Sequence, residues 1–257
     1  MSSREFVKCY SLPKLRSEIC EAASEQEFHQ NRLQNEPFHD KINIANLESE
    51  GKNTMRFKPL QVQDHLGRTV ILRSAEMSDA EALVKYMKIT SAETPFLIRE
   101  PDEFHMTLEQ EKTFIRNCID NARELMLIAT INGEHVGNCS LMSIGAYKRY
   151  RHRCEIAIAL YQKYCGTGIG TIMLETVLSV AKELGYEQAE LEVIEGNERA
   201  FKLYQKLGFR PFGTFPNNMK YADGTYADAV WMMKKLNVPE SASYDSDVQK
   251  TSALFHS

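Results

Sequence analysis

Three glycines alternate with other residues in the stretch YCGTGIG, which runs from Tyr164 to Gly170. An apolar helical pattern begins directly after them, so the stretch is expected to join a strand to a helix. Unpartnered backbone N–H groups and the positive end of the helix dipole meet at such a junction. Glycines let a ligand approach this backbone closely, and the combination suits a phosphate group. A tight strand-to-helix turn without a ligand explains the same glycines.

Two well-known phosphate-binding loops do not fit this stretch. A P-loop ends in Gly-Lys-Ser/Thr, whereas this loop ends in Gly170-Thr171 without a lysine. A dinucleotide-binding loop belongs to a β-α-β unit at the front of a parallel sheet. Here an expected antiparallel meander, with a hairpin turn at Asn132-Gly133, precedes the loop. The sequence therefore disfavours both kinds of loop.

A second motif, NERAFKLYQKLGF, runs from Asn197 to Phe209. Together with YCGTGIG it resembles the GNAT superfamily of acetyl-CoA-dependent N-acetyltransferases. The family pattern is an Arg/Gln-Gly-x-Gly-x-Gly/Ala loop, then a helix and a strand, then Asn-x-x-Ala-x-x-Leu-Tyr-x-Lys-x-Gly-Phe. The first motif keeps its glycines but has Cys165 where Arg or Gln is usual. The second motif meets every fixed position of the pattern: Asn197, Ala200, Leu203, Tyr204, Lys206, Gly208 and Phe209. An ordinary capped amphipathic helix is the alternative interpretation of this second motif.

The resemblance implies acetyl-CoA as co-substrate and no metal. The pyrophosphate would lie on backbone amides of the glycine loop, and the pantetheine arm would run like an added strand along the end of a strand that splays from the next one. Cys165 is expected to weaken this binding without abolishing it, because the backbone cradle remains. The implied cofactor-binding residues are Ile158, Ala159, Leu160, Cys165, Gly166, Thr167, Gly168, Ile169, Gly170, Asn197 and Tyr204.

The chemistry that the resemblance implies is direct attack of an amine on the thioester. An alkyl ammonium, with a pKa near ~10.4, must first lose a proton. Tyr204, by its place in the motif, is the expected proton donor to the departing thiolate, and packing of its helix on the sheet is its other role. Glu155 and Glu192 are the candidate bases, acting through water, although a merely solvated position explains either. A covalent role for Cys165 is not expected, because the family transfers the acetyl group directly.

The acceptor site in this family is built from the first two helices, their connection and the last hairpin. The connection here is ITSAETPFLIREPDEFHM, residues 89–106. Glu93 and Glu100 suit a cationic amine and Phe96 suits an apolar wall, although a solvated acidic loop explains the same residues. The expected acceptor is a primary amine of a small molecule (a polyamine, amino acid or amine antibiotic) or a protein N-terminus. The alternatives are a non-catalytic acetyl-CoA-binding regulatory module and a GNAT-like scaffold with a protein partner.

The elements that must position these residues follow the order β-α-α-β-β-β-α-β-α-β-β between Thr69 and Leu236. Capping boxes are expected at Ser78 with Glu81 and at Thr107 with Gln110. The expected fold class is α/β (α+β), the GNAT fold, with a mixed, twisted sheet of six or seven strands and helices on both faces.

The chain has 257 residues, 43% of them hydrophobic, which is enough for one sizeable core. Residues 1–54 are polar and show no strand pattern, so a flexible extension is expected there, with a docking helix as the alternative. Residues 55–236 are expected to form the acetyltransferase domain, and residues 237–257 a flexible tail.

Charge and cysteine content limit the classes of partner and the cellular compartment that are expected. The net charge of −4 disfavours nucleic-acid binding, and the basic run from Tyr147 to Arg153 is better explained as a solvated hairpin rim. The six cysteines show no zinc-ligand spacing, the polar start lacks a signal peptide, and no apolar run spans a bilayer. We therefore expect a cytoplasmic protein with reduced thiols whose partners are amine substrates, not nucleic acid or membrane. A homodimer is compatible with this expectation.

Overall fold

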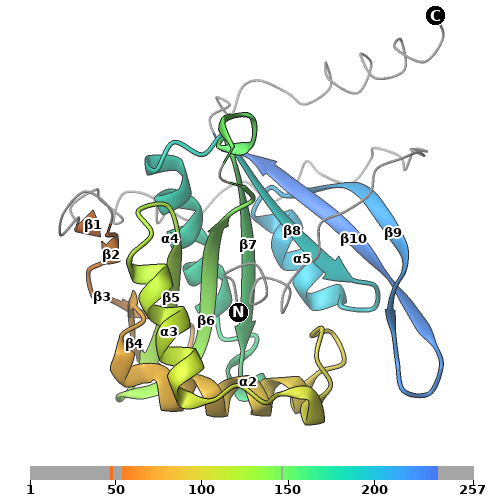
Figure 1. The fold of residues 1–257 in the computed structure, drawn as a ribbon, viewed down its shortest axis with the longest axis horizontal. Coiled ribbons are helices and arrows are strands. Elements are labelled where there is room, and N and C mark those ends of the chain that lie inside the picture. The colour runs from red at the N-terminus through yellow and green to blue at the C-terminus, as the bar shows by residue number, and fades with distance from the viewer. Residues whose placement is uncertain (1–46, 49–53, 146, 237–257) are drawn as a thin grey trace, which may run out of the picture.

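The computed structural model describes residues 47–48, 54–145 and 147–236 (Figure 1). Its main feature is one eight-stranded sheet in the order β3-β4-β5-β6-β7-β8-β10-β9. Neighbouring strands are antiparallel except for β7 and β8, which are parallel. The strands are β3 Leu60–Gln63, β4 Thr69–Ser74, β5 Leu125–Ile131, β6 Glu134–Ser143, β7 Arg153–Leu160, β8 Gln188–Ile194, β9 Arg210–Lys220 and β10 Tyr226–Lys235.

In the described part of the chain, four helices cover the sheet, two on each face (Figure 1). None of the helices in the described part of the chain is long and apolar enough to cross a membrane. The helices are α2 Ala80–Glu93, α3 Leu108–Ile119, α4 Ile169–Glu183 and α5 Glu198–Lys206, and the short 3-10 turns are η3 Met77–Asp79, η4 Pro101–Glu103, η5 Lys148–Tyr150 and η6 Gln162–Tyr164.

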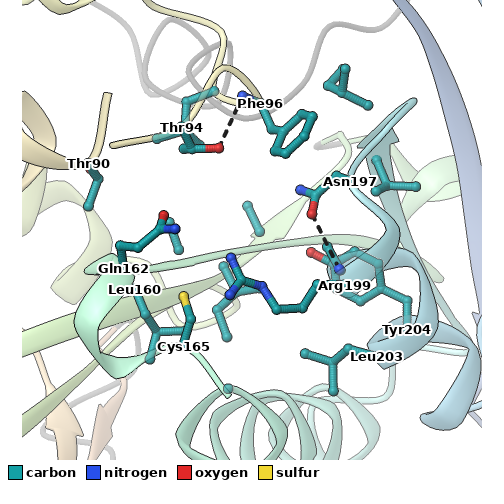
Figure 2. Close-up of a pocket in the computed structure, with 18 of the residues that line it drawn as sticks. Thr90, Thr94, Phe96, Leu160, Gln162, Cys165, Asn197, Arg199, Leu203 and Tyr204 are labelled. Atoms are coloured by element: carbon teal, nitrogen blue, oxygen red, sulfur yellow. Dashed lines mark hydrogen bonds between the residues drawn. The ribbon is translucent and has the colours of Figure 1, made fainter. Parts of the chain in front are cut away.

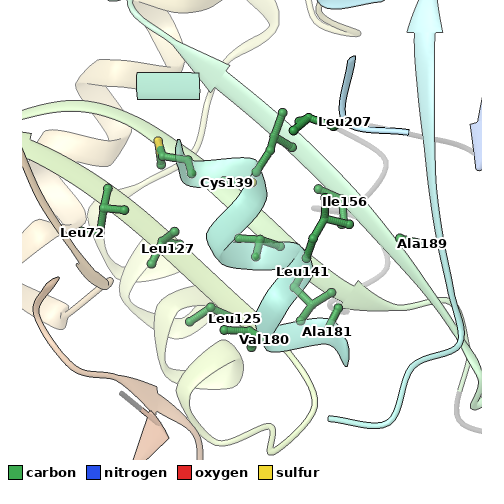
Figure 3. Close-up of a cluster of buried hydrophobic side chains, with 14 of the residues drawn as sticks. Leu72, Leu125, Leu127, Cys139, Leu141, Ile156, Val180, Ala181, Ala189 and Leu207 are labelled. Atoms are coloured by element: carbon green, nitrogen blue, oxygen red, sulfur yellow. The ribbon is translucent and has the colours of Figure 1, made fainter. Parts of the chain in front are cut away.

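The central strand β5 shows why both faces need helices. Every residue of LMLIATI is buried, as expected for a strand covered on both sides. Successive side chains point to opposite faces, so Leu125 and Leu127 join the core under α4, while Met126 and Ile128 pack under α2 and α3. Figure 3 shows the α4 side of this arrangement, where Val180 and Ala181 lie against the sheet. Two separate cores therefore hold the sheet from its two sides.

The predicted fold class is confirmed, with one more strand than the six or seven expected. The additional strand is β3, which pairs antiparallel with β4 and forms one edge of the sheet. Its four residues, LQVQ, include a single buried side chain, Val62. So short a strand with so little apolar content gives no clear alternation in the sequence.

The segment before residue 54 contains a strand that the sequence did not predict. β1 (Leu47–Glu48) pairs antiparallel with β2 (Arg56–Phe57). Phe57, in β2, is 2% exposed and belongs to the α4-side core, so the described chain enters the core at this strand. The expectations for residues 1–46 and 237–257 lie outside the described residues, and the division of the chain at residues 54 and 236 stays a prediction.

The two predicted capping boxes have different outcomes. The box at Thr107 is confirmed, because its hydroxyl accepts from Gln110 N and the Gln110 side chain accepts from Thr107 N. The box at Ser78 with Glu81 is wrong. The chain begins a 3-10 turn there, and the Asp79 carboxylate accepts from Glu76 N at 2.7 Å.

The physical reason for the second outcome is an ion pair. Arg73, at the end of β4, binds the Asp79 carboxylate through both terminal nitrogens, at 2.7 and 2.8 Å. This bidentate contact holds Asp79 back toward the sheet, where it closes the turn with Glu76. α2 therefore begins at Ala80, after the turn.

The contact between β6 and β7 leaves no room for a side chain at Gly137. A Cβ atom added there would lie 2.7 Å from the Ala159 carbonyl oxygen and 2.8 Å from Leu160 Cγ. By contrast, an added Cβ at Gly213 in the edge strand β9 would meet nothing within 4 Å. Both glycines have an ordinary strand conformation, since neither has a positive φ.

We expect Gly137→Ala to lower the free energy of unfolding by about 1–3 kcal/mol, because it forces β6 away from β7. Gly213→Ala is the matched control, and it should leave stability unchanged or raise it slightly, since alanine reduces the freedom of the unfolded chain. Urea denaturation of both variants measures the difference. Equal stability of the two would show that β6 and β7 are not closely packed here.

Candidate active site

The only parallel pair of strands in the described sheet, β7 and β8, separates partway along its length. Paired residues run from Arg153 with Gln188 to Glu155 with Glu190 and go no further. Beyond this point β7 stays with β6 as far as Leu160, and β8 stays with β10 as far as Ile194. The two strands therefore diverge and leave an opening in the middle of the sheet (Figure 1).

The opening exposes backbone hydrogen-bonding groups of β7. Tyr161 N donates to Val136 O at 3.1 Å, which shows which residues of β7 form hydrogen bonds to β6. In an antiparallel ladder alternate residues bond to the partner strand, so Ala159 bonds to β6, while Ile158 and Leu160 direct their N–H and C=O groups to the other side. That side faces the opening, and these groups are free to bind an extended ligand there.

A cavity of about 350 Å³ occupies this opening. The end of β7, the glycine loop, the α2–α3 connection, the first turns of α5 and the β9–β10 hairpin all contribute to its wall. Figure 2 shows Thr94 and Phe96 on one side of it, Leu160 and Cys165 on a second, and Asn197, Leu203 and Tyr204 on a third.

The glycine loop leads from the end of β7 to the start of α4, as its sequence predicts. Gly166 and Gly168 have φ values of 80° and 89°, in the left-handed region that favours glycine. α4 begins at Ile169 with Gly168 as its N-cap and without a side-chain cap, so the N–H groups of its first turn remain available. His65, from the β3–β4 turn, donates its backbone N–H to Thr167 O at 2.9 Å. Its imidazole lies so close that a Cβ at Gly168 would come within 2.5 Å of Nε2.

Tyr204 lies at the far wall of the cavity on α5. Asn197 caps this helix by accepting from Ala200 N at 3.3 Å, as predicted. The Tyr204 ring is 7% exposed and packs edge-on against Phe209. Burial raises the pKa of its phenol, so the hydroxyl keeps its proton. The hydroxyl makes no hydrogen bond to the described residues, so it can donate one into the cavity.

Three carboxylates lie on β7 and β8 where these strands separate. Glu190 forms a bidentate ion pair with Arg153, with Nη2 2.6 Å from Oε2. Glu192 accepts from Asn218 Nδ2 at 2.9 Å and from Trp231 Nε1 at 3.0 Å. Glu155 has no hydrogen bond or ion pair within the described part of the chain.

Crowding of the three carboxylates changes their affinity for protons. Burial, and then the neighbouring Glu192 and Glu190 carboxylates, raise the pKa of Glu155 to about 8. Burial also raises the pKa of Glu192, and the hydrogen bonds from Trp231 and Asn218 offset part of this change. Glu155 is therefore a carboxyl that exchanges a proton near neutral pH, next to a carboxylate that is held in a fixed orientation.

The acceptor-site residues expected from the sequence fall into two groups. Glu93 and Phe96 line the cavity, and Glu93 Oε2 accepts from Gln162 N at 2.7 Å. Glu100 does not line it, because it caps η4 in a reciprocal pair with Glu103. The Glu93 carboxylate thus ties the end of α2 to the turn that leads into the glycine loop.

Most of the residues predicted to bind the cofactor line this one cavity. Ile169 does not, because its side chain is 1% exposed and packs in the core. Thr167 and Glu155 do not line it either, although Thr167 belongs to the glycine loop and Glu155 lies at the point where β7 and β8 part.

Sequence reasoning missed four residues that shape the site. Arg199 and His65 line the cavity, and Asn218 and Trp231 hold Glu192. Arg199 occupies a variable position of the second motif. Its positive charge, in a motif expected to lie beside a phosphate site, was the signal that could have identified it. His65, Asn218 and Trp231 gave no such signal, because only the folded sheet brings the β3–β4 turn to the glycine loop and brings β9 and β10 to Glu192.

Comparisons with known proteins agree on one family. Residues 86–209 match the family described as Acetyltransferase (GNAT) family. YwnH of Bacillus subtilis, which bears the name of a phosphinothricin acetyltransferase, is 26% identical over 145 residues, covering 56% of this chain and 86% of that protein. An N-alpha-acetyltransferase of Saccharolobus solfataricus is 26% identical over 166 residues, covering 63% of this chain and 89% of that protein.

Solved structures share the fold. A GNAT-family acetyltransferase from Streptococcus pneumoniae superimposes with a TM-score of 0.62 at 28% identity, covering 65% of this chain and 99% of that one. The fold of yncA from Salmonella typhimurium, solved with its cofactor acetyl-CoA, matches with a TM-score of 0.58 at 17% identity, covering 68% of this chain and 98% of that one. Among the described residues of the present protein, no group of three or more His, Cys, Asp or Glu side chains is placed to hold a metal ion.

The crowding of carboxylates predicts a pH-dependent contribution to stability. The pKa of Glu155 rises from 4.5 to about 8 on folding, so the native state binds this proton more tightly than the unfolded chain. The stability that this proton confers is complete below pH 4.5 and is lost as the pH rises through about 8. Glu155→Gln, which cannot ionise, should therefore gain about 1 kcal/mol or more relative to the wild type as the pH rises from roughly 5 to 8.

Urea denaturation of both proteins across this pH range provides the measurement. In a Glu192→Gln background the gain should shrink, because one of the carboxylates that raise the pKa of Glu155 is gone. A constant difference between wild type and Glu155→Gln at all pH values would contradict the raised pKa of Glu155.

Proposed function

Since this chain belongs to the GNAT family of acetyltransferases, we propose that it transfers an acetyl group from acetyl-CoA directly to a primary amine. The observation that carries this proposal is the cavity between β7 and β8. It brings together the glycine loop, the unpaired backbone of Ile158 and Leu160, and the Tyr204 hydroxyl, which lie on three separate elements.

Acetyl-CoA fits this cavity in one orientation. Its pyrophosphate binds the N–H groups between Gly166 and Gly170, where the positive end of the α4 dipole adds to the attraction. The amide groups of its pantetheine arm pair with Ile158 and Leu160 in place of the missing β8 ladder. The thioester then lies near Tyr204, at the inner end of the cavity.

The reaction forms one bond and breaks one. The amine nitrogen, once deprotonated, attacks the thioester carbonyl carbon, and the C–S bond breaks as the amide forms. The departing thiolate takes the proton of the Tyr204 hydroxyl, which burial has kept in its neutral form. The nitrogen loses its remaining extra proton as the amide forms, and this proton returns through water to the Tyr204 phenolate. Direct transfer needs no covalent enzyme intermediate, and Cys165 serves as part of the phosphate cradle.

Glu155 is the stronger candidate for the base that deprotonates the amine. A general base works best when its pKa lies near the operating pH, and burial, followed by the neighbouring carboxylates, raises the pKa of Glu155 to about 8. Glu155 does not line the cavity, so it acts through a water molecule. Glu192, whose oxygens hold Asn218 and Trp231, lines the cavity and orients that water.

The acceptor is a primary amine at the end of the cavity formed by the α2–α3 connection and the β9–β10 hairpin. Phe96 and Met219 supply apolar contacts there, and Glu192 supplies negative charge for an ammonium group. The relatives bear names that point to two acceptor classes, a small amino acid analogue and a protein N-terminus. Small-molecule and peptide amines both remain in the proposal.

An acceptor panel tests the proposal. Thiol release from acetyl-CoA is measured with polyamines, amino acids, an aminoglycoside, and short peptides with free N-termini. At least one amine should accelerate thiol release at least ~100-fold over the acceptor-free rate, and the acetylated amine should appear in equal amount. Tight acetyl-CoA binding without acceleration by any amine would instead support a regulatory or scaffold role.

The role of Tyr204 is tested by Tyr204→Phe, which keeps the ring and removes only the hydroxyl. We expect kcat to fall by about 100-fold, at the lower end for general acid catalysis, while acetyl-CoA affinity stays nearly constant. The melting temperature is measured on the same preparation. Unchanged turnover per folded molecule would make Tyr204 a packing residue and leave the proton transfer to water.

A further inference from the structure

The family pattern has Arg or Gln at the start of the glycine loop, and this chain has Cys165. A thiol with this burial carries no charge at neutral pH, because burial raises its pKa. The loop itself therefore offers backbone N–H groups but no cation to a doubly charged pyrophosphate. The structure nevertheless places a cation opposite Cys165, on a different element.

That cation is Arg199 in the first turn of α5. Its side chain lines the cavity, and in Figure 2 it extends across the cavity so that the guanidinium lies toward Cys165. The two side chains are close enough for the positive charge of Arg199 to lower the pKa of the Cys165 thiol, against the larger effect of burial. Arg199 thus extends across the cavity toward Cys165, the position at which the family pattern has Arg or Gln.

No group in the described part of the protein neutralises Arg199. It forms no hydrogen bond or ion pair there, and its neighbour Glu198 is 3.9 Å from Lys202 on the outer side of the helix. The other charge near Cys165 is Glu93, which is bound to Gln162 N at 2.7 Å. A cation is also unfavourable in the first turn of a helix, where the dipole is positive. Arg199 therefore keeps a free positive charge in an unfavourable position.

An anion bound in the cavity compensates the positive charge of Arg199. The N-termini of α4 and α5 both contribute to the cavity wall, and Arg199 adds a planar guanidinium that can bind two phosphate oxygens at once. We propose that Arg199 binds the pyrophosphate of acetyl-CoA and supplies the positive charge that Cys165 does not. This inference rests on the proposed function of the same cavity, and it assigns the phosphate contact to α5 instead of the loop.

Four proteins test the proposal: wild type, Arg199→Gln, the double variant Cys165→Arg with Arg199→Gln, and Lys202→Gln. Lys202 is the matched control, since it is a cation on the same helix that does not line the cavity. Calorimetry gives the Kd for CoA and for 3′-dephospho-CoA, which keeps the pyrophosphate and lacks the third phosphate. Melting temperatures of all four proteins check that they are folded.

Arg199→Gln should weaken binding of both ligands by about 10-fold, the factor expected for one hydrogen-bonded contact to a charged group. Lys202→Gln should bind as the wild type does. The double variant should recover most of the lost affinity, because an arginine at position 165 can reach the same phosphate from the loop side.

Each contrary result has a distinct meaning. Wild-type affinity in folded Arg199→Gln would overturn the role of Arg199 and leave the proposed function intact. A loss for CoA but not for 3′-dephospho-CoA would move the contact to the 3′-phosphate and overturn the pyrophosphate assignment. Failure of the wild type to bind CoA would overturn the proposed function, and the role of Arg199 with it.

Discussion

The active site depends on the early end of the parallel ladder between β7 and β8. Backbone N–H and C=O groups are rarely left without partners inside a protein. Within the described residues, the backbone groups of Ile158 and Leu160 that point away from β6 have no partner, because β8 leaves β7 after Glu190 and follows β10. The loss is tolerated because β6 and α4 hold β7 on its other sides. The strand therefore offers a prepared edge, and an extended ligand can complete the sheet.

Charges around this edge are separated along the cavity. The glycine loop, the N-termini of two helices and Arg199 make one end positive, which suits phosphates. Glu192 makes the region near the acceptor negative, and Glu155 adds negative charge there when it has lost its proton. Only Glu190 of the three neighbouring carboxylates has an arginine partner. An acetyl donor with phosphates and an acceptor with an ammonium group are thus drawn to opposite ends. Their reactive atoms then meet near Tyr204.

The sequence predicted those parts of the fold and site that depend on local chemistry. The strand-to-helix junction at the glycine loop, the Asn197 cap and the Thr107 box are each set by a few neighbouring residues. It missed what depends on contacts beyond the immediately neighbouring residues. Arg73 displaces the start of α2, β3 is recognisable only when paired, and His65 reaches Gly168 from a turn more than a hundred residues earlier in the chain. Arg199 was visible within a motif, but its direction depends on the packing of α5.

The central claim is that β7 and the glycine loop bind acetyl-CoA through their backbone. Amide hydrogen exchange, followed residue by residue with and without acetyl-CoA, tests it most directly. The account predicts added protection at Ile158 and Leu160 and in the loop from Gly166 to Gly170. It predicts no added protection in β4 or β5, whose amides already belong to the sheet. Acetyl-CoA binding that leaves exchange at Ile158, Leu160 and the loop unchanged would contradict the account.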